Sequence, residues 1–231
     1  MKKTFILLLC TSFLLCGFGG PAPEAPKEAT AGGTGDTLLV DDFERGNLTE
    51  PDWWKFDKVS FTVVGNSSYQ TGDEISLKAI GKYSLNIKGK ATNWYAGGGG
   101  IYIAKPKTDL SKYANVQIDV YGNGPGSGTL QIELYDDDNG NWQVEQDPKK
   151  NYVPLNDDKL QYQLSVNWKG WKRVVIPITD FEDINPEVGD DIWNPEQKGG
   201  SGGLLQVQII AIGPTKSGDI NYNIDNIILA K

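Results

Sequence analysis

Alternation of apolar and polar residues with a period of two is the feature of this sequence that most restricts its fold. Val116, Ile118 and Val120 alternate with polar residues, and the same alternation recurs over 129–135 and 206–209. Successive side chains of a β-strand point to opposite faces, so each segment predicts a strand with one face in a core. From Thr37 onward no segment sustains the 3.6-residue period of a helix.

Clusters of Gly, Asn, Asp and Pro separate these predicted strands, at 122–128, 136–141, 199–203 and 216–219. Short strands at this spacing are typical of an antiparallel two-sheet β-sandwich of jelly-roll type. We therefore predict an all-β fold with one domain over residues 37–231. Its first strand starts at Thr37 and its last strand starts at Ile220.

The N-terminus predicts export from the cytoplasm. Two lysines precede an apolar run over residues 5–15, which is too short to span a bilayer, so residues 1–19 are interpreted as a signal peptide. Gly17 and Gly19 suit cleavage before Gly20, whereas Cys16 suits lipid attachment as in bacterial lipoproteins. Residues 20–36 are rich in Pro, Ala and Gly and predict a flexible tether. These features predict a protein that is secreted, or held at the outer membrane, cell surface or periplasm, with membrane contact only through a lipid anchor.

Composition excludes several classes of function. The chain has no histidine, which removes Ser-His-Asp and Cys-His catalysis. It has 22 Lys and Arg against 30 Asp and Glu, a net charge of −8, which argues against nucleic acid and against anionic lipid surfaces. Hard cations such as calcium, and neutral ligands such as sugars, remain compatible with an acidic surface.

Carboxylates lie among apolar residues in both terminal strands. Asp41, Asp42 and Glu44 are in the first strand, and Asp225 is in the last. A buried carboxylate needs a partner, and a calcium ion that bridges the two strands would supply one. The alternatives are that these carboxylates face solvent at the strand ends, or that they pair with Arg45.

Aromatic residues beside amides are candidates for sugar binding, because sugars stack on aromatic rings and bond to amides. Trp94, Trp142 and Trp193 each lie close to asparagines, whereas Trp53 and Trp171 are predicted to be core residues. The glycine run 97–100 indicates either close approach of a ligand or a β-bulge. The three aspartates 136–138 lie in a turn, where they are more typical of a solvated cluster or of loose calcium binding than of the paired acids of a glycosidase.

Several motifs, in order, make the chain resemble the family 11 carbohydrate-binding modules from about Leu38 to Lys231. They are LVDDFE with the following Trp53–Trp54, GKYSLNI, NWYAGGGGIYI, DLSKYANVQIDVYG, TLQIELYDDDNGNW, WKRVVIPITDF and INYNIDNIILA. The motifs DDFE and IDNI are also found in the related complex I intermediate-associated fold.

The resemblance implies a galactose-binding-like jelly roll with a structural calcium held by Asp42, Glu44 and Asp225. It also implies non-catalytic binding of a polysaccharide or glycan. Where the family has basic and tyrosyl residues after PITDF, this chain has 182–184, EDI. The alternative function is a structural or assembly protein of the envelope or a surface structure, in which the same fold contacts a protein partner. The resemblance and the aromatic pattern together give these candidate ligand-binding residues: Phe56, Trp94, Tyr95, Asp138, Asn139, Trp142 and Trp193.

Overall fold

The computed structural model describes residues 37–69, 77–103, 110, 112–193 and 204–231. The predicted signal peptide, the tether and Cys16 lie outside the described residues. None of the helices in the described ranges is long and apolar enough to cross a membrane.

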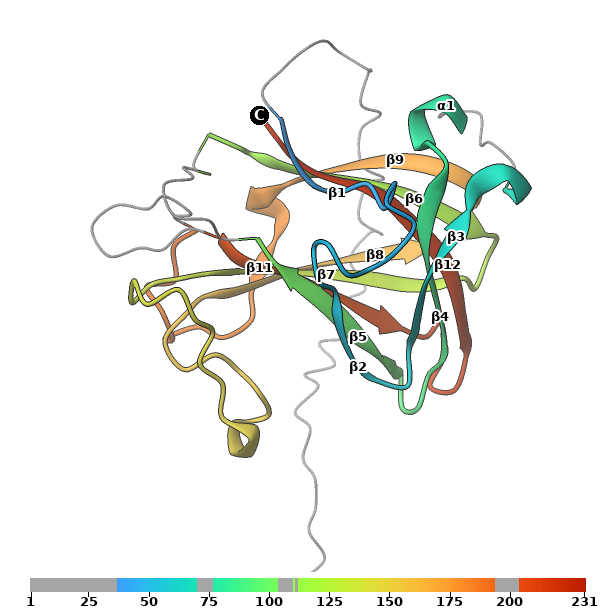
Figure 1. Cartoon of the computed structure of the whole chain (residues 1–231). Coiled ribbons are helices and arrows are strands. Elements are labelled where there is room, and N and C mark those ends of the chain that lie inside the picture. Colours follow the sequence, from blue (N-terminus) through green and yellow to red (C-terminus); the bar gives the residue numbers. More distant parts are fainter. Residues whose placement is uncertain (1–36, 70–76, 104–109, 111, 194–203) are drawn as a thin grey trace, which may run out of the picture.

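The described chain forms two antiparallel sheets that pack face to face, as Figure 1 shows. Sheet I has the order β3-β4-β12-β6-β9, and β1 pairs with the C-terminal half of β12. Sheet II has the order β10-β8-β7-β11-β5-β2. The predicted all-β antiparallel sandwich of jelly-roll type is confirmed.

Sheet I consists of β1 (Thr37–Asp41), β3 (Ser60–Gly65), β4 (Tyr83–Lys90), β6 (Asn115–Asn123), β9 (Lys169–Pro177) and β12 (Asp219–Ala230). Sheet II consists of β2 (Trp54–Asp57), β5 (Tyr95–Tyr102), β7 (Gly128–Asp136), β8 (Lys159–Val166), β10 (Glu182–Asp183) and β11 (Leu204–Ile212). The described helical segments are α1 (Leu77–Ile80) and three 3-10 turns at Asn66–Ser68, Pro148–Lys150 and Ile178–Asp180.

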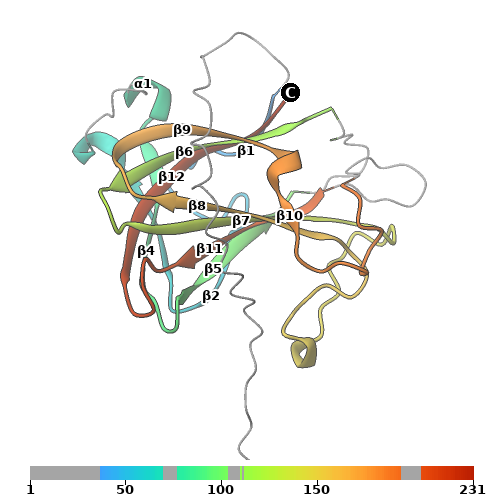
Figure 2. The same ribbon diagram turned by 180° about the vertical axis from the view of Figure 1, so that it is seen from behind.

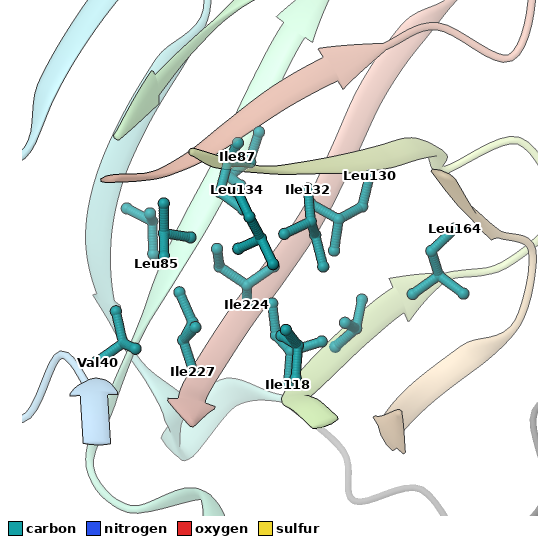
Figure 3. Packing of buried hydrophobic residues seen from close by; sticks show 14 of the residues in the cluster. Val40, Leu85, Ile87, Ile118, Leu130, Ile132, Leu134, Leu164, Ile224 and Ile227 are labelled. Carbon is teal, nitrogen blue, oxygen red and sulfur yellow. The ribbon is translucent and has the colours of Figure 1, made fainter. Parts of the chain in front are cut away.

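The core lies between the sheets and is built from the apolar half of each alternating strand. Side chains from both sheets meet there, as Figure 3 shows for Leu85, Ile118 and Ile224 of sheet I against Ile132 and Leu134 of sheet II. All five are at most 1% exposed. Burial of such side chains contributes about 1.5–3 kcal/mol each, which makes the alternation decisive for the fold.

The two tryptophans predicted to be core residues are buried. Trp53 is 6% exposed, and its indole N–H donates to Asp41 at 2.7 Å. Trp171 is fully buried in a separate small cluster with Ile80 and Tyr121.

The strand order places three short turns at one end of the sandwich and one long connection at the other. The turns β2–β3, β4–β5 and β11–β12 lie at one end, and the long β7–β8 connection extends from the other end (Figures 1 and 2). Tyr95 of β5 is level with Thr129 of β7 through their shared partner Ile212. The seven residue-to-residue steps from Thr129 to Asp136 therefore separate these two ends by roughly 24 Å.

Candidate functional site

The outer face of sheet II carries a buried polar network. Leu130, Ile132 and Leu134 of β7 point into the core, so strand alternation turns the residues between them to the outer face. The same holds for β11, whose polar residues pair with those of β7 in register. The polar network consists of Gln131, Glu133, Tyr135, Lys159, Gln163, Gln206 and Gln208.

Glu133 is the centre of this network and is only 2% exposed. Its Oε1 accepts from the Gln131 amide at 2.6 Å and lies 3.1 Å from the Lys159 ammonium. Its Oε2 accepts from the Tyr135 hydroxyl at 3.0 Å and from the Gln208 amide at 2.5 Å. Burial and the neighbouring Glu133 charge raise the pKa of Tyr135 well above its ordinary value. A buried carboxylate with four donors fixes the orientation of the surrounding amides.

A row of four aromatic side chains borders the network along the β2–β5 edge of the same face. Phe56 and Trp54 of β2 stack with ring centroids 5.7 Å apart, and Trp54 lies 6.3 Å from Tyr102. A register shift beside Ala211 restores Tyr95 to this face, and its hydroxyl donates to Asp57 at 2.5 Å. Tyr102 is 63% exposed and Tyr95 is 37% exposed, while Phe56 and Trp54 are half-buried. These four residues are called the aromatic row.

The rings of Phe56 and Trp54 pack against glycines of β5. A methyl group on Gly98 would lie 2.7 Å from the Phe56 ring, and one on Gly100 would lie 2.9 Å from the Trp54 ring. On the core side, a methyl group on Gly99 would lie 2.6 Å from the Phe61 ring. The glycine run therefore serves the packing of aromatic rings from neighbouring strands, in a strand that keeps regular pairing from Gly97 to Tyr102.

The candidate ligand-binding residues fall into separate places. Phe56 and Tyr95 belong to the aromatic row, and Trp94 stands at its β4–β5 end, 43% exposed with φ 76°. Trp193 is half-buried against the core. The candidates Asp138, Asn139 and Trp142 lie in the β7–β8 connection, beyond the opposite end of sheet II.

Sequence reasoning missed Trp54, Tyr102 and the polar network as parts of one surface. The signal was present in the polar half of the alternating strands, since Gln131 and Glu133 are two positions apart in one segment and Gln206 and Gln208 are two positions apart in another. Their alignment with the aromatic row depends on strand pairing across more than 70 residues of sequence.

Of the three residues predicted to hold calcium, Asp225 is in β12, whereas Asp42 and Glu44 follow β1, which ends at Asp41 and not at Glu44. Asp225 is fully buried, its Oδ1 accepts from the Asn226 backbone N–H, and its Oδ2 has no hydrogen-bond partner among the described residues. Burial and the charges of Asp119, Glu44 and Asp42 raise the pKa of Asp225 to about 9. A buried carboxylate oxygen without a donor beside two further carboxylates fits a cation site. These three residues are called the terminal-strand clasp.

The neighbouring acids of the clasp already have partners. Asp41 pairs with Arg45 through two contacts of 3.0 and 2.9 Å, and Asp119 pairs with Arg173 through two of 2.8 Å. The pairing with Arg45 that the sequence left open thus applies to Asp41. Glu44 accepts the backbone N–H groups of residues 82 and 83 with Oε1.

A second acidic group lies where the β7–β8 connection meets sheet II. Oxygens of Asp136, Asp138 and Asp158 lie within 4.8 Å of one another. Burial, together with the charge of Asp158, raises the pKa of Asp138 to about 7. Burial likewise raises the pKa of Asp158 to about 6, with the charges of Asp190 and Asp183.

Comparison with known proteins gives likeness to solved structures only. No protein-family model and no curated protein sequence matches the chain. The family 11 carbohydrate-binding module of the cellulosomal cellulase Lic26A-Cel5E of Clostridium thermocellum is 15% identical, with a TM-score of 0.48 over 86% of this chain and 96% of that chain. A Clostridium thermocellum family 11 module in complex with a β-1,3-1,4-mixed-linked tetrasaccharide is 16% identical, with a TM-score of 0.49 over 86% and 97%. The CBM22-2 xylan-binding domain from Paenibacillus barcinonensis Xyn10C is 19% identical, with a TM-score of 0.42 over 83% and 98%. At these identities and scores, the likeness assigns neither a family nor a ligand to this chain.

Proposed function

We propose that this protein is a non-catalytic carbohydrate-binding domain and that a polysaccharide or glycan chain lies along the aromatic row. The observation that carries the proposal is the alignment of the aromatic row, Tyr95, Phe56, Trp54 and Tyr102, beside the polar network on one sheet face.

The aromatic row suits a linear sugar chain. Alternate residues of a strand are about 6.7 Å apart, so the rings repeat along β2 and β5 at a spacing comparable with a sugar unit. The C–H face of a sugar packs against an aromatic ring, and Tyr and Trp add a polar group at the ring edge.

The polar side of the same face suits sugar hydroxyls. Each Gln amide offers both donors and an acceptor, as a hydroxyl does. Gln163 is exposed and bonds to Gln131, which in turn bonds to Glu133, so the outermost amide is held in place. A glycosidase would need two carboxylates around one bond, whereas Glu133 is engaged by four donors that include Lys159.

Titration calorimetry against soluble β-glucans, xylans and mannans tests this proposal. Trp54→Ala is expected to weaken binding about tenfold or more, through loss of about 1.4 kcal/mol of stacking and burial. Tyr152→Ala is the matched control, because Tyr152 is 60% exposed in the β7–β8 connection, away from the row.

Absence of heat with every glycan would overturn the function, and equal losses in both variants would overturn the choice of surface. A stable complex with an envelope protein, found without glycan binding, would instead support the assembly function.

We also propose that calcium occupies the terminal-strand clasp and ties β1 to β12. A ligand bound only by the folded state stabilises it, so chelation is expected to lower the melting temperature. Asp225→Asn is expected to reduce this calcium effect, and Asp219→Asn, which changes an exposed carboxylate of the same strand, is not. An identical response to chelation in Asp225→Asn and wild type would remove this site.

The proposal includes export of the protein, because the polysaccharides that it would bind lie outside the cytoplasm. We propose that the N-terminus is a signal and that Cys16 carries a lipid anchor. Incorporation of labelled palmitate that is lost in Cys16→Ala would support the anchor, and unlabelled wild-type protein would contradict it.

A further inference from the structure

The outer face of sheet I carries a line of polar side chains on the side of the sandwich opposite the aromatic row (Figure 1). Alternate residues of its strands lie in the core, so the residues between them face outward. Ser60 of β3 pairs with Lys88 of β4, and Lys88 pairs with Asn221 of β12. Asn123 of β6 pairs with Lys169 of β9, and its amide donates to the Asn221 backbone carbonyl at 2.8 Å. These five residues are called the lysine–amide row.

The charge of the lysine–amide row is opposite in sign to that of the chain. The chain has a net charge of −8, yet Lys88 and Lys169 are exposed and form no ion pair with any described residue. Lys90 lies two residues after Lys88 and faces the exposed Asp219 across the β4–β12 pair, so these two charges offset each other. The row therefore keeps two positive charges that no described carboxylate neutralises.

The hydrogen bonds of Asn86 fix the orientation of the Asn221 amide. The Asn86 side-chain nitrogen donates to the Tyr222 backbone carbonyl at 3.3 Å. A backbone carbonyl only accepts, so the nitrogen and the oxygen of the Asn86 amide cannot be exchanged. The same nitrogen donates to Oδ1 of Asn221 at 3.0 Å. The Nδ2 group of Asn221, on the other side of its amide, has no acceptor within the part of the chain that the structure describes and is left as a donor.

Asn123 presents an acceptor beside this donor. Its Nδ2 donates to the Asn221 backbone carbonyl, so its Oδ1 lies on the opposite side of the amide, and the residue is exposed. From β4 to β9 the row thus offers an ammonium group, an amide N–H, an amide oxygen and a second ammonium group.

We infer that the lysine–amide row binds an acidic polysaccharide through carboxylates of its sugar units, at a site separate from the aromatic row. Ammonium and amide N–H groups donate charge-assisted hydrogen bonds to carboxylate oxygens. The Asn123 oxygen accepts from a hydroxyl, which a carboxylated sugar carries near its carboxylate. Lys88 and Lys169 are three strand spacings apart, roughly 14 Å, so their ammonium groups suit carboxylates on different units of one extended chain.

Two cellulose derivatives test the inference by titration calorimetry. Carboxymethylcellulose and hydroxyethylcellulose share a glucan backbone, and only the first carries carboxylates. The titrations use Trp54→Ala protein, so that stacking on the aromatic row does not contribute. Carboxymethylcellulose is expected to bind this protein and to bind more weakly at high salt, which screens exposed charges. Hydroxyethylcellulose is expected to bind at least about tenfold more weakly than carboxymethylcellulose.

A double variant, Lys88→Gln with Lys169→Gln, tests the row itself. It is expected to bind carboxymethylcellulose at least about tenfold more weakly, through loss of both ammonium groups. The matched control is Lys149→Gln with Lys150→Gln, which removes the same charge from two exposed lysines in the β7–β8 connection and is expected to leave binding unchanged.

Asn221→Asp tests the amide donor. The new carboxylate still accepts from Asn86 but presents an oxygen to the ligand in place of an N–H group. Weaker binding of carboxymethylcellulose is expected, at an unchanged melting temperature.

Equal affinities of the two double variants would overturn the inference, because net charge alone would then govern binding. Absence of carboxymethylcellulose binding would also overturn it. Vesicles that contain phosphatidylserine are the alternative probe, and binding of these vesicles without carboxymethylcellulose binding would assign the row to a membrane surface instead.

Discussion

Replacement of Glu133 by alanine is expected to destabilise the protein by about 3–5 kcal/mol, because it leaves the polar network without its acceptor. Four donors lose their partner, and they differ in access to water. Lys159 has a side chain 15% exposed and can be rehydrated, whereas Tyr135 is 1% exposed and Gln208 is 8% exposed. Each donor left buried and unsatisfied costs about 1–3 kcal/mol, so these two account for most of the loss.

Urea unfolding followed by tryptophan fluorescence measures this effect. With a slope of about 2 kcal/mol/M, the midpoint is expected to fall by about 1.5–2.5 M at unchanged slope. Glu182→Ala is the matched control, because Glu182 is an exposed carboxylate level with Glu133 through their shared partner Gln161. It is expected to stay within about 0.5 kcal/mol of wild type. A loss below about 1 kcal/mol in Glu133→Ala would refute the view that Glu133 organises this face.

Three further predictions concern the core and β5. Tyr222→Phe is expected to leave stability unchanged or raise it by about 1 kcal/mol in urea unfolding, since the buried Tyr222 hydroxyl has no hydrogen-bond partner in the part of the chain that the structure describes. Clear destabilisation would contradict this. Gly99→Ala is expected to destabilise the protein by about 1–3 kcal/mol, because the new methyl group would lie 2.6 Å from the Phe61 ring. Gly65→Ala is the control and should not destabilise the protein, because nothing lies within 4 Å of its new methyl group. Burial raises the pKa of Tyr222, so as pH rises this tyrosine ionises in the unfolded chain before it ionises in the folded one. The stability of the protein should therefore decline as pH rises above about 10. Melting curves should show a shallower decline in Tyr222→Phe.

Local pattern was sufficient for the fold class. The alternation around Val116, Ile118 and Val120 and the Gly/Asn/Asp clusters act over a few residues, so they predict strands and turns without knowledge of partners. Trp171 is predicted as a core residue because it precedes an apolar segment, and Trp53 because it follows the DDFE motif. The acids of the terminal strands were also visible, because carboxylates among apolar residues are conspicuous in any sequence.

The candidate sites depended on contacts between distant segments. Tyr95, Phe56, Trp54 and Tyr102 form one row only because β2 and β5 pair in one register, and a shift by one residue would send their side chains to the opposite face.

The sequence by itself determined that this chain is an all-β sandwich whose acids and aromatics are candidates for binding. Only the tertiary structure decided which of them act together: Asp41 pairs with Arg45, and Asp225 is within range of the charges of Asp42 and Glu44. The physical reason is that strand propensity is a local property, whereas register and loop closure are fixed by the packing of the whole core.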